Sequence, residues 1–258
     1  MAHYSRKKAI LIIAFSTLLV SGSSALSLLF FRLQEVFHSK NEVYNIHSIV
    51  QTGPQYGALK TLFLSETLGL SIDAPVNIYS FDIEQATQKL MGTHIIQSVS
   101  LKKIKPDILC IDYTLRKPVA KMGSLTNTYV DAQGVLFPAH PFYSPKKIPE
   151  LIVEGGPQVW GGALNSTRLA QMNGLLKHFE KEEVIRIDLS MVDAPSIGSR
   201  EIVVMVKQGQ SVHTLRLPRE GFESAIQNYF QLHKQLLASE KKSTLIDLRL
   251  PDMAFLNQ

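Results

Sequence analysis

The sequence predicts an α+β protein: an N-terminal transmembrane helix, then a small β-α-α-β-β domain, then a larger, mainly antiparallel β domain that carries two helices. Three observations support this prediction. A stretch of 23 residues near the N-terminus carries no charge, two helical patterns follow inside a segment bounded by strand patterns, and the second half alternates strand patterns with turns. With 258 residues, 45% hydrophobic and 19% charged, the chain suits one or two globular domains.

The net charge of +5 does not indicate a nucleic-acid partner. The first 31 residues contain a basic cluster and no acidic residue; the cluster is Arg6, Lys7 and Lys8. The remainder holds 24 Lys and Arg against 22 Asp and Glu. A DNA-binding protein carries its basic excess as a patch on a folded domain. Cys110, the single cysteine, excludes an intrachain disulfide and is interpreted as a small core residue of a strand rather than a catalytic thiol.

The uncharged segment, residues 9–31, is predicted to be a transmembrane helix. At about 1.5 Å per residue it spans roughly 35 Å, enough for a hydrocarbon core of about 30 Å. Because the basic cluster precedes it and the charges after it cancel, residues 1–8 are expected to be a cytoplasmic tail and the bulk of the chain to lie outside the cytoplasm. A signal peptide cleaved near Ala25 is the alternative, although the apolar run continues to Phe31. Residues 32–42 are interpreted as a linker.

Residues 43–115 are predicted to form the small domain. Its expected elements are a strand at 43–50, helices at 58–70 and 82–92, and strands at 95–102 and 107–115. Leu62 is expected on the inner face of the first helix, which Gly69 is placed to end. Asp82 is a candidate N-cap of the second helix, with Gln85 at the capping-box position.

Residues 116–258 are predicted to form the β domain. Its strand patterns lie at 128–131, 134–137, 150–153, 184–190, 201–207, 211–217 and 243–250, and its helices at 167–180 and 220–238. Residues 207–210 are expected to form a hairpin turn. Asn165 begins a formal glycosylation sequence but lies where a helix needs an N-cap, and capping is the favoured role.

No motif in the sequence indicates catalysis or metal binding. The eight histidines lack the spacing of a zinc site, and neither a nucleophile elbow nor a phosphate-binding loop is present. Asp188 and Asp247 lie on strands, but nothing indicates that they converge for acid–base work. Trp160 is interpreted as a packing residue rather than a ligand platform. We therefore expect a binding protein rather than an enzyme, with no cofactor, no metal and no small-molecule substrate.

Three short motifs resemble those of the bacterial cell-division family FtsQ/DivIB. Residues 115–120, Leu-Arg-Lys-Pro-Val-Ala, are similar to the joint between the family's two extracytoplasmic domains. Residues 130–137 resemble its Val-Asp-x-x-Gly turn, and residues 246–249, Ile-Asp-Leu-Arg, resemble its Val-Asp-Leu-Arg motif. The resemblance covers essentially the full length and implies a cytoplasmic tail, one membrane helix, a POTRA domain over 43–115 and a β domain.

The resemblance also implies a function. The family is a non-enzymatic scaffold of the division complex (the divisome) in the cytoplasmic membrane at the septum, and it recruits small FtsB/DivIC-like and FtsL-like coiled-coil proteins. If the strand at 243–250 lies at a sheet edge, a partner strand could pair with it. The expected partner-binding residues are Arg200, Ile246, Leu248, Arg249, Leu250, Met253 and Phe255. The alternatives are that Leu248 and Leu250 are core residues, or that the protein is a POTRA-bearing assembly or secretion factor or a secreted hydrolase.

Overall fold

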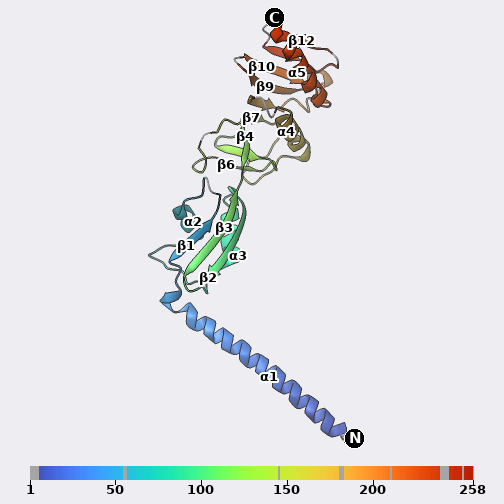
Figure 1. The fold of residues 1–258 in the computed structure, drawn as a ribbon. Coiled ribbons are helices and arrows are strands. Elements are labelled where there is room, and N and C mark those ends of the chain that lie inside the picture. The colour runs from blue at the N-terminus through green and yellow to red at the C-terminus, as the bar shows by residue number, and fades with distance from the viewer. Residues whose placement is uncertain are drawn as a thin grey trace. The chain divides into compact units, whose positions relative to one another are not determined.

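The computed structural model describes residues 6–54, 57–144, 146–179, 183–209, 211–238, 244–251 and 253–257. The fold is mixed α+β, with a long apolar N-terminal helix followed by two β sheets (Figure 1). The chain forms two compact units, and it passes from the first to the second for the last time between Tyr113 and Thr114. The domain joint expected from the sequence lies just beyond this point, at Arg116.

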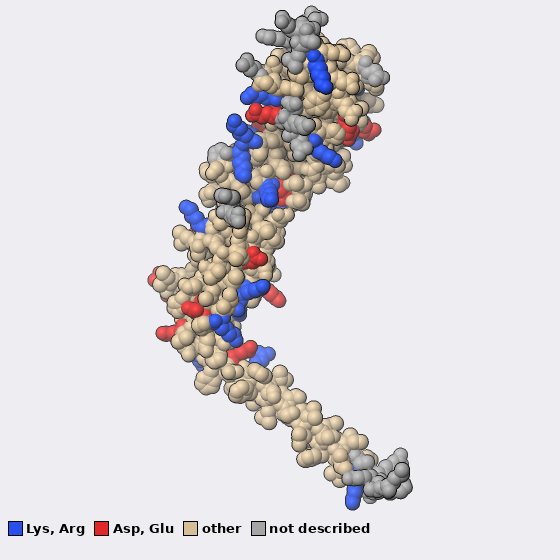
Figure 2. Space-filling model, in the orientation of Figure 1, with Lys and Arg blue, Asp and Glu red and all other residues tan. Residues whose placement is uncertain are grey.

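The N-terminal helix, α1 (Arg6–Ser39), contains a segment long and apolar enough to cross a membrane. Most of its length shows no charged side chain in Figure 2. The helix continues past residue 31, so the linker expected at 32–42 is wrong for most of its length. Residues 32–39 contain neither glycine nor proline, and nothing in their backbone ends the helix earlier. Asn41 then caps a short 3₁₀ turn, η1 (Glu42–Tyr44).

The first unit is built on a three-stranded sheet. Its elements in chain order are β1 (Ser48–Thr52), α2 (Thr61–Leu68), α3 (Ile83–Met91), β2 (Ile96–Ile104) and β3 (Ile108–Leu115). The strand order is β1-β3-β2, and β1 runs parallel to β3. The chain therefore passes through strand, helix, helix, strand and strand, with β3 at the centre of the sheet (Figure 1).

Alternation along β3 separates its two faces. Leu109, Ile111 and Tyr113 are buried, whereas Asp112 is exposed. Cys110 lies on the face opposite the core and is only partly buried, so it is not the core residue expected from the sequence.

The helix ends of the first unit agree with the sequence prediction, but the buried face of one helix differs from it. The Asp82 carboxylate accepts a hydrogen bond from the Gln85 amide at 3.0 Å, which caps α3 as predicted. Gly69 ends α2 with a φ of 71°, a conformation that favours glycine. Leu62 is 66% exposed, so its predicted place on the inner face of α2 is wrong; Leu64 and Leu68 are buried there, and Leu59, also predicted on that face, is buried just before the helix.

The second unit contains a nine-stranded sheet of order β12-β11-β10-β9-β8-β7-β4-β5-β6. Its strands are β4 (Pro118–Met122), β5 (Thr128–Asp131), β6 (Leu136–Pro138), β7 (Glu150–Ile152), β8 (Glu183–Asp188), β9 (Ile202–Gln208), β10 (Ser211–Leu217), β11 (Leu245–Asp247) and β12 (Phe255–Leu256). The pairs β4/β7, β7/β8 and β10/β11 are parallel. The other neighbouring pairs are antiparallel.

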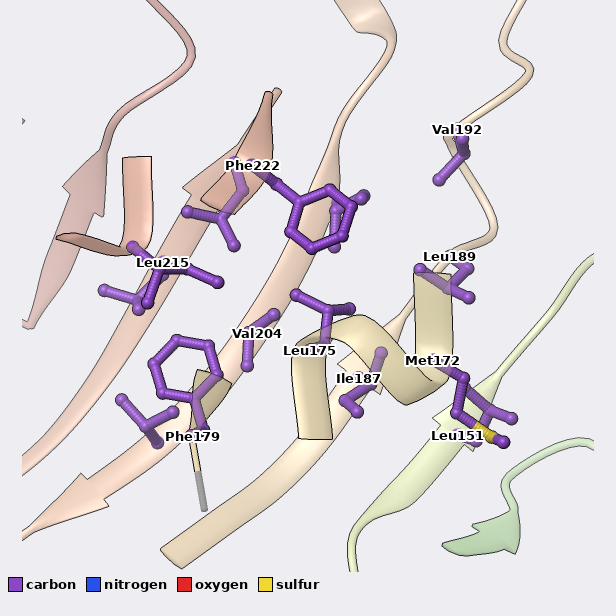
Figure 3. Packing of buried hydrophobic residues seen from close by; sticks show 14 of the residues in the cluster. Leu151, Met172, Leu175, Phe179, Ile187, Leu189, Val192, Val204, Leu215 and Phe222 are labelled. Carbon is purple, nitrogen blue, oxygen red and sulfur yellow. The ribbon is translucent and has the colours of Figure 1, made fainter. Parts of the chain in front are cut away.

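Two helices, α4 (Ser166–His178) and α5 (Phe222–Ala238), contribute to the core of this unit. In Figure 3, Leu175 of α4 lies beside Ile187 and Val204 of two adjacent strands, and Met172 lies beside Leu151 of β7. Asn165 caps α4, because its side-chain oxygen accepts a hydrogen bond from the Arg168 amide at 2.8 Å. The capping role expected from the sequence is thus confirmed.

The first strand begins at Ser48, after η1, and not at residue 43 as predicted. Two further strand assignments, both in the second unit, differ from the sequence prediction. β4 was not expected, because an Arg-Lys-Pro sequence precedes its apolar residues. Pro118 is the first residue of the strand, where a missing N–H is tolerated. The strand expected at 243–250 is only three residues long, β11, and the chain then turns near Pro251 and returns as β12. Ser243 lies outside the described residues.

Candidate functional site

A row of side chains crosses the C-terminal strands on one face of the nine-stranded sheet. Arg216 on β10 lies opposite Asp247 on β11, and Asp247 lies opposite Phe255 on β12. Directly opposed residues of neighbouring strands project to the same side of a sheet. This face is the reverse of the one that holds Leu215 and Ile246 in the core.

Four charged groups form a closed network within this row. Arg216 contacts Glu201 at 2.6 Å and Asp247 at 3.2 Å. Arg249 contacts the same two carboxylates, at 3.3 Å and 2.8 Å. Arg249 also donates to the carbonyl oxygen of Gly198 at 2.8 Å, which joins the β11 end to the loop before β9. Each cation thus bridges two carboxylates, and each carboxylate accepts from two guanidinium groups.

The network keeps Asp247 ionised. Burial alone would raise the pKa of this carboxyl group, but hydrogen bonds from the Arg249 side chain and backbone, with the charges of Arg249 and Arg216, outweigh burial and lower it. The hydrogen bond to Asp247 in turn raises the pKa of Arg249. A carboxylate held in this state is a structural anion and is poorly suited to act as a general acid at neutral pH.

The outermost strand at this end is β12 rather than β11. Ile246 pairs with Leu256 and Asp247 with Phe255, and the Asn257 amide donates to the carbonyl oxygen of Leu245 at 3.1 Å. The expectation that the strand predicted at 243–250 offers its own edge to a partner is therefore wrong. The returning C-terminal segment already occupies that side of β11.

Exposed apolar side chains surround this edge. Leu250 is 50% exposed and Phe255 56% exposed, and both line a groove of about 660 Å³. The groove is also lined by Ile197, Gly198, Arg200, Pro218, Arg219, Glu220, Asp247 and Arg249. We call β11, β12, their connecting turn and this groove the C-terminal edge. Met253, 55% exposed, lies in the connecting turn.

The seven residues expected to bind a partner divide into two groups. Ile246 and Leu248 are 0% and 4% exposed and belong to the core, so their side chains do not offer the specificity expected of them. The other five lie at the C-terminal edge: Arg200, Arg249, Leu250, Met253 and Phe255. The alternative that both leucines are core residues is thus confirmed for Leu248 and wrong for Leu250.

Arg200 lies two residues before the start of β9 and donates from Nε to the carbonyl oxygen of Ala194 at 2.8 Å. This bond fixes the root of the guanidinium group at the groove. Among the described residues, Arg200 has no ion-pair partner, whereas Arg219 contacts Asp193 at 3.0 Å.

Sequence reasoning did not identify Ile197 in the lining of the groove, or Glu201 and Arg216 in the ion-pair network beside it. Alternation along 211–217 does place Arg216 opposite in direction to Leu215, and this signal could have identified its face. The sequence could not show which residues neighbour Arg216, because β10 and β11 pair in parallel although α5 lies between them in the chain.

The remaining candidates do not converge on a second site. Asp188 accepts hydrogen bonds from the amide and hydroxyl of Ser190, and it lies on β8, three strand spacings or about 14 Å from β11 and Asp247. The Trp160 indole donates to the Thr128 hydroxyl at 3.1 Å. In the part of the chain that the structure describes, no three His, Cys, Asp or Glu side chains are grouped to hold a metal ion.

The basic cluster Arg6, Lys7 and Lys8 forms the start of α1. Lys8 is exposed, whereas the side chains of Arg6 and Lys7, like residues 1–5, lie outside the described residues. A comparison with models of known protein families gave no match, and a comparison with curated proteins gave none either.

Proposed function

We propose that this protein is a non-enzymatic, membrane-anchored scaffold of the bacterial division complex, similar to the FtsQ/DivIB family. In this proposal α1 is retained in the cytoplasmic membrane with the N-terminus in the cytoplasm, and both folded units lie outside. The first unit is a POTRA-like domain and the second a β domain. The C-terminal edge binds partner division proteins of the FtsB/DivIC and FtsL type.

The observation that carries the proposal is the exposed apolar C-terminal edge. β12 ends the strand order of the sheet, and an end strand has one side of its backbone free to pair with another chain. Because β12 is only two residues long, backbone pairing supplies few hydrogen bonds. The groove beside it must therefore provide most of the affinity, through Leu250 and Phe255.

The charges at the groove favour a particular kind of partner. Arg249 and Asp247 compensate one another, whereas Arg200 presents a guanidinium group without an ion-pair partner among the described residues. An extended partner segment with apolar side chains and one carboxylate matches these features. Burying that carboxylate against Arg200 would select against partners that lack it.

The secreted hydrolase receives no support from the site's geometry, because Asp188 and Asp247 are separated by two strands. The other alternative, an assembly or secretion factor, would also have a POTRA-like first unit. It would differ from the proposed scaffold in the partner that it binds.

A fluorescent protein fused before Met1 tests the cellular role in the native host or a close relative. We expect a band at midcell from a full-length, membrane-bound product. A diffuse signal accompanied by a cleaved, freely soluble exported domain would refute the anchor and the division role together.

Capture of the host's FtsB/DivIC-like and FtsL-like proteins by the full chain tests the edge. Leu250→Asp and Phe255→Asp should each weaken capture at least about tenfold, since a charge in a desolvated apolar contact costs more than about 1.4 kcal/mol. Val159→Asp is the matched control, because Val159 is exposed and apolar but does not line the groove. Equal capture by all three variants would place the partner elsewhere.

A further inference from the structure

An aromatic cluster ties the last turn of α1 to the first unit. His38 Nδ1 lies 3.0 Å from the Tyr79 hydroxyl, and the His38 ring lies 4.7 Å from the ring of Tyr44. Tyr44 and Tyr79 meet edge to face at 5.1 Å. The buried Asn77 donates to the carbonyl oxygens of His38 at 3.0 Å and Asn41 at 3.1 Å. These contacts hold the two tyrosines close to the end of α1.

Basic side chains lie beside this cluster. The Lys105 ammonium group is 4.5 Å from the centre of the Tyr79 ring. Burial is the main cause that lowers the pKa of Lys103, and Lys105 lowers it further. Glu35, on α1, acts in the opposite direction on the pKa of Lys103, as does Asp82. Lys103 lies on β2, and Lys105 follows in the turn to β3, where its contact with Tyr79 places it beside the aromatic cluster at the end of α1.

The length of α1 sets the height of the cluster above a bilayer. His38 lies seven residues, or about 10 Å, beyond Phe31, where the uncharged segment ends. The headgroup layer extends about 5–8 Å beyond the hydrocarbon core. Leu33, Val36 and Phe37 are all exposed, and burying them would draw the helix end closer to the acyl chains. His38 and the tyrosines therefore fall near the level of the lipid headgroups.

The side chains present at this level suit a membrane surface. Tyrosine is enriched at membrane–water boundaries, and lysines near an anionic bilayer are attracted to it. Ile104, beside Lys105, is 45% exposed and adds an apolar contact. Within the described ranges Lys105 has no ion-pair partner, so its charge is available to a phosphate group. Glu35 and Glu42 also lie in this region and offset part of its positive charge. The attraction therefore depends on where Lys105 is placed and not on the net charge of the region.

We propose that His38, Tyr44, Tyr79, Lys103 and Lys105, the juxtamembrane cluster, dock the first unit on anionic phospholipid headgroups. The inference rests on the part of the proposed function that retains α1 in the membrane. It does not depend on the division role. We assign the bilayer surface as the binding partner of the juxtamembrane cluster because the cluster lies at the end of the membrane helix α1.

Hydrogen exchange of the full chain in nanodiscs tests the proposal. The bilayers are phosphatidylcholine alone or an equal mixture with phosphatidylglycerol. The amides of residues 102–105 and of Asp107 should exchange about fivefold more slowly in the anionic bilayer, the factor expected from the attraction of one lysine. Lys105→Gln should remove the difference. Lys146→Gln is the matched control, because Lys146 lies over the ring of Tyr143, at 5.7 Å, in the second unit, and it should leave the difference intact.

Three results would overturn the proposal. Equal exchange in the two bilayers, with the protein stably inserted, would reject docking while leaving the anchor and the division role in place. Slowing by inorganic phosphate over a neutral bilayer would identify a soluble-anion site instead of a surface contact. Failure of the chain to insert at all would reject docking and the anchored scaffold together.

Discussion

At the scale of single residues, one buried ion pair explains the composition of the joint between β3 and β5. Asp131 is 1% exposed, and its carboxylate lies 2.6 Å from Arg116. The same carboxylate accepts hydrogen bonds from the amides of Gln133 and Val135, at 3.0 Å and 2.9 Å. Arg116 also donates to the carbonyl oxygen of His94 at 3.0 Å. The Arg-Lys-Pro sequence and the Asp-x-x-Gly turn are therefore two halves of one contact.

Removal of the Asp131 side chain tests the contribution of this pair to stability. Asp131→Ala should lower the free energy of unfolding of the second unit by about 3–5 kcal/mol, because it leaves Arg116 and two amides without their partner. Asp131→Asn should cost less, since its oxygen can still accept from the amides. Urea denaturation followed by Trp160 fluorescence measures both.

The exposed pair of Lys207 and Glu183 is the control for Asp131. Its atoms are 3.5 Å apart and about half of each side chain is exposed. Glu183→Gln should change the free energy of unfolding by less than about 1 kcal/mol. If the two carboxylate-to-amide substitutions cost the same, the buried pair would contribute nothing beyond a surface contact.

A second residue-scale prediction concerns His213. Burial lowers the pKa of its imidazole, and the neighbouring His233 lowers it further. Its Nδ1 lies 2.8 Å from the Tyr229 hydroxyl. Because the folded pKa lies below the unfolded value, the unfolded chain binds more protons below about pH 6.5, and stability falls as the pH drops through that value.

The pH dependence should be measured on His213→Gln beside the parent chain. Glutamine can keep a hydrogen bond to Tyr229 but does not titrate. Between the folded pKa and about pH 6.5, the parent should lose up to about 1.4 kcal/mol more stability per pH unit than the variant. Parallel stability curves for the two proteins would show that His213 does not titrate differently on folding.

At the scale of elements, features set by residues close in sequence could be predicted, whereas features that depend on how strands pair could not. The caps at Asp82 and Asn165 are confirmed because a cap and its amide lie three residues apart. The burial of Leu248 and the exposure of Leu250 could not be read from alternation alone, since β11 ends at Asp247. The position of the turn near Pro251 decides which side chains remain outside.

Leu248 and Leu250 form a matched pair for testing this division. Leu248→Ala should lower the free energy of unfolding by about 2–5 kcal/mol, because it leaves a cavity in the core. Leu250→Ala should change it by less than about 1 kcal/mol, since the side chain is half exposed. Urea denaturation of the full chain in detergent measures both. Similar costs would mean that the turn after β11 holds Leu250 as firmly as the core holds Leu248.

At the scale of the whole molecule, the mixed α+β class and the apolar N-terminal helix were predictable because both depend on composition and period. The extent of α1 was not, because residues 32–39 are polar enough to read as a linker yet contain no residue that ends a helix. The outer edge of the large sheet was also missed, since it depends on a return of the chain over residues 248–256. The residues predicted to bind a partner thus fall partly in the core and partly beside an edge strand that the sequence did not predict, and their binding role stays a prediction.

The basic cluster gives the last prediction, which concerns the orientation of the entire chain. Lys7→Glu with Lys8→Glu reverses the charge at the start of α1, before the uncharged segment, and should lower by at least about half the fraction of chains that place the folded units outside the cytoplasm. Alkaline phosphatase fused after Gln258, which is active only outside the cytoplasm, measures that fraction. Lys146→Glu with Lys147→Glu changes the net charge equally in the second unit and should have no effect. If both double variants export equally, orientation is set by something other than the charges flanking α1, and the positive-inside argument for a cytoplasmic N-terminus fails.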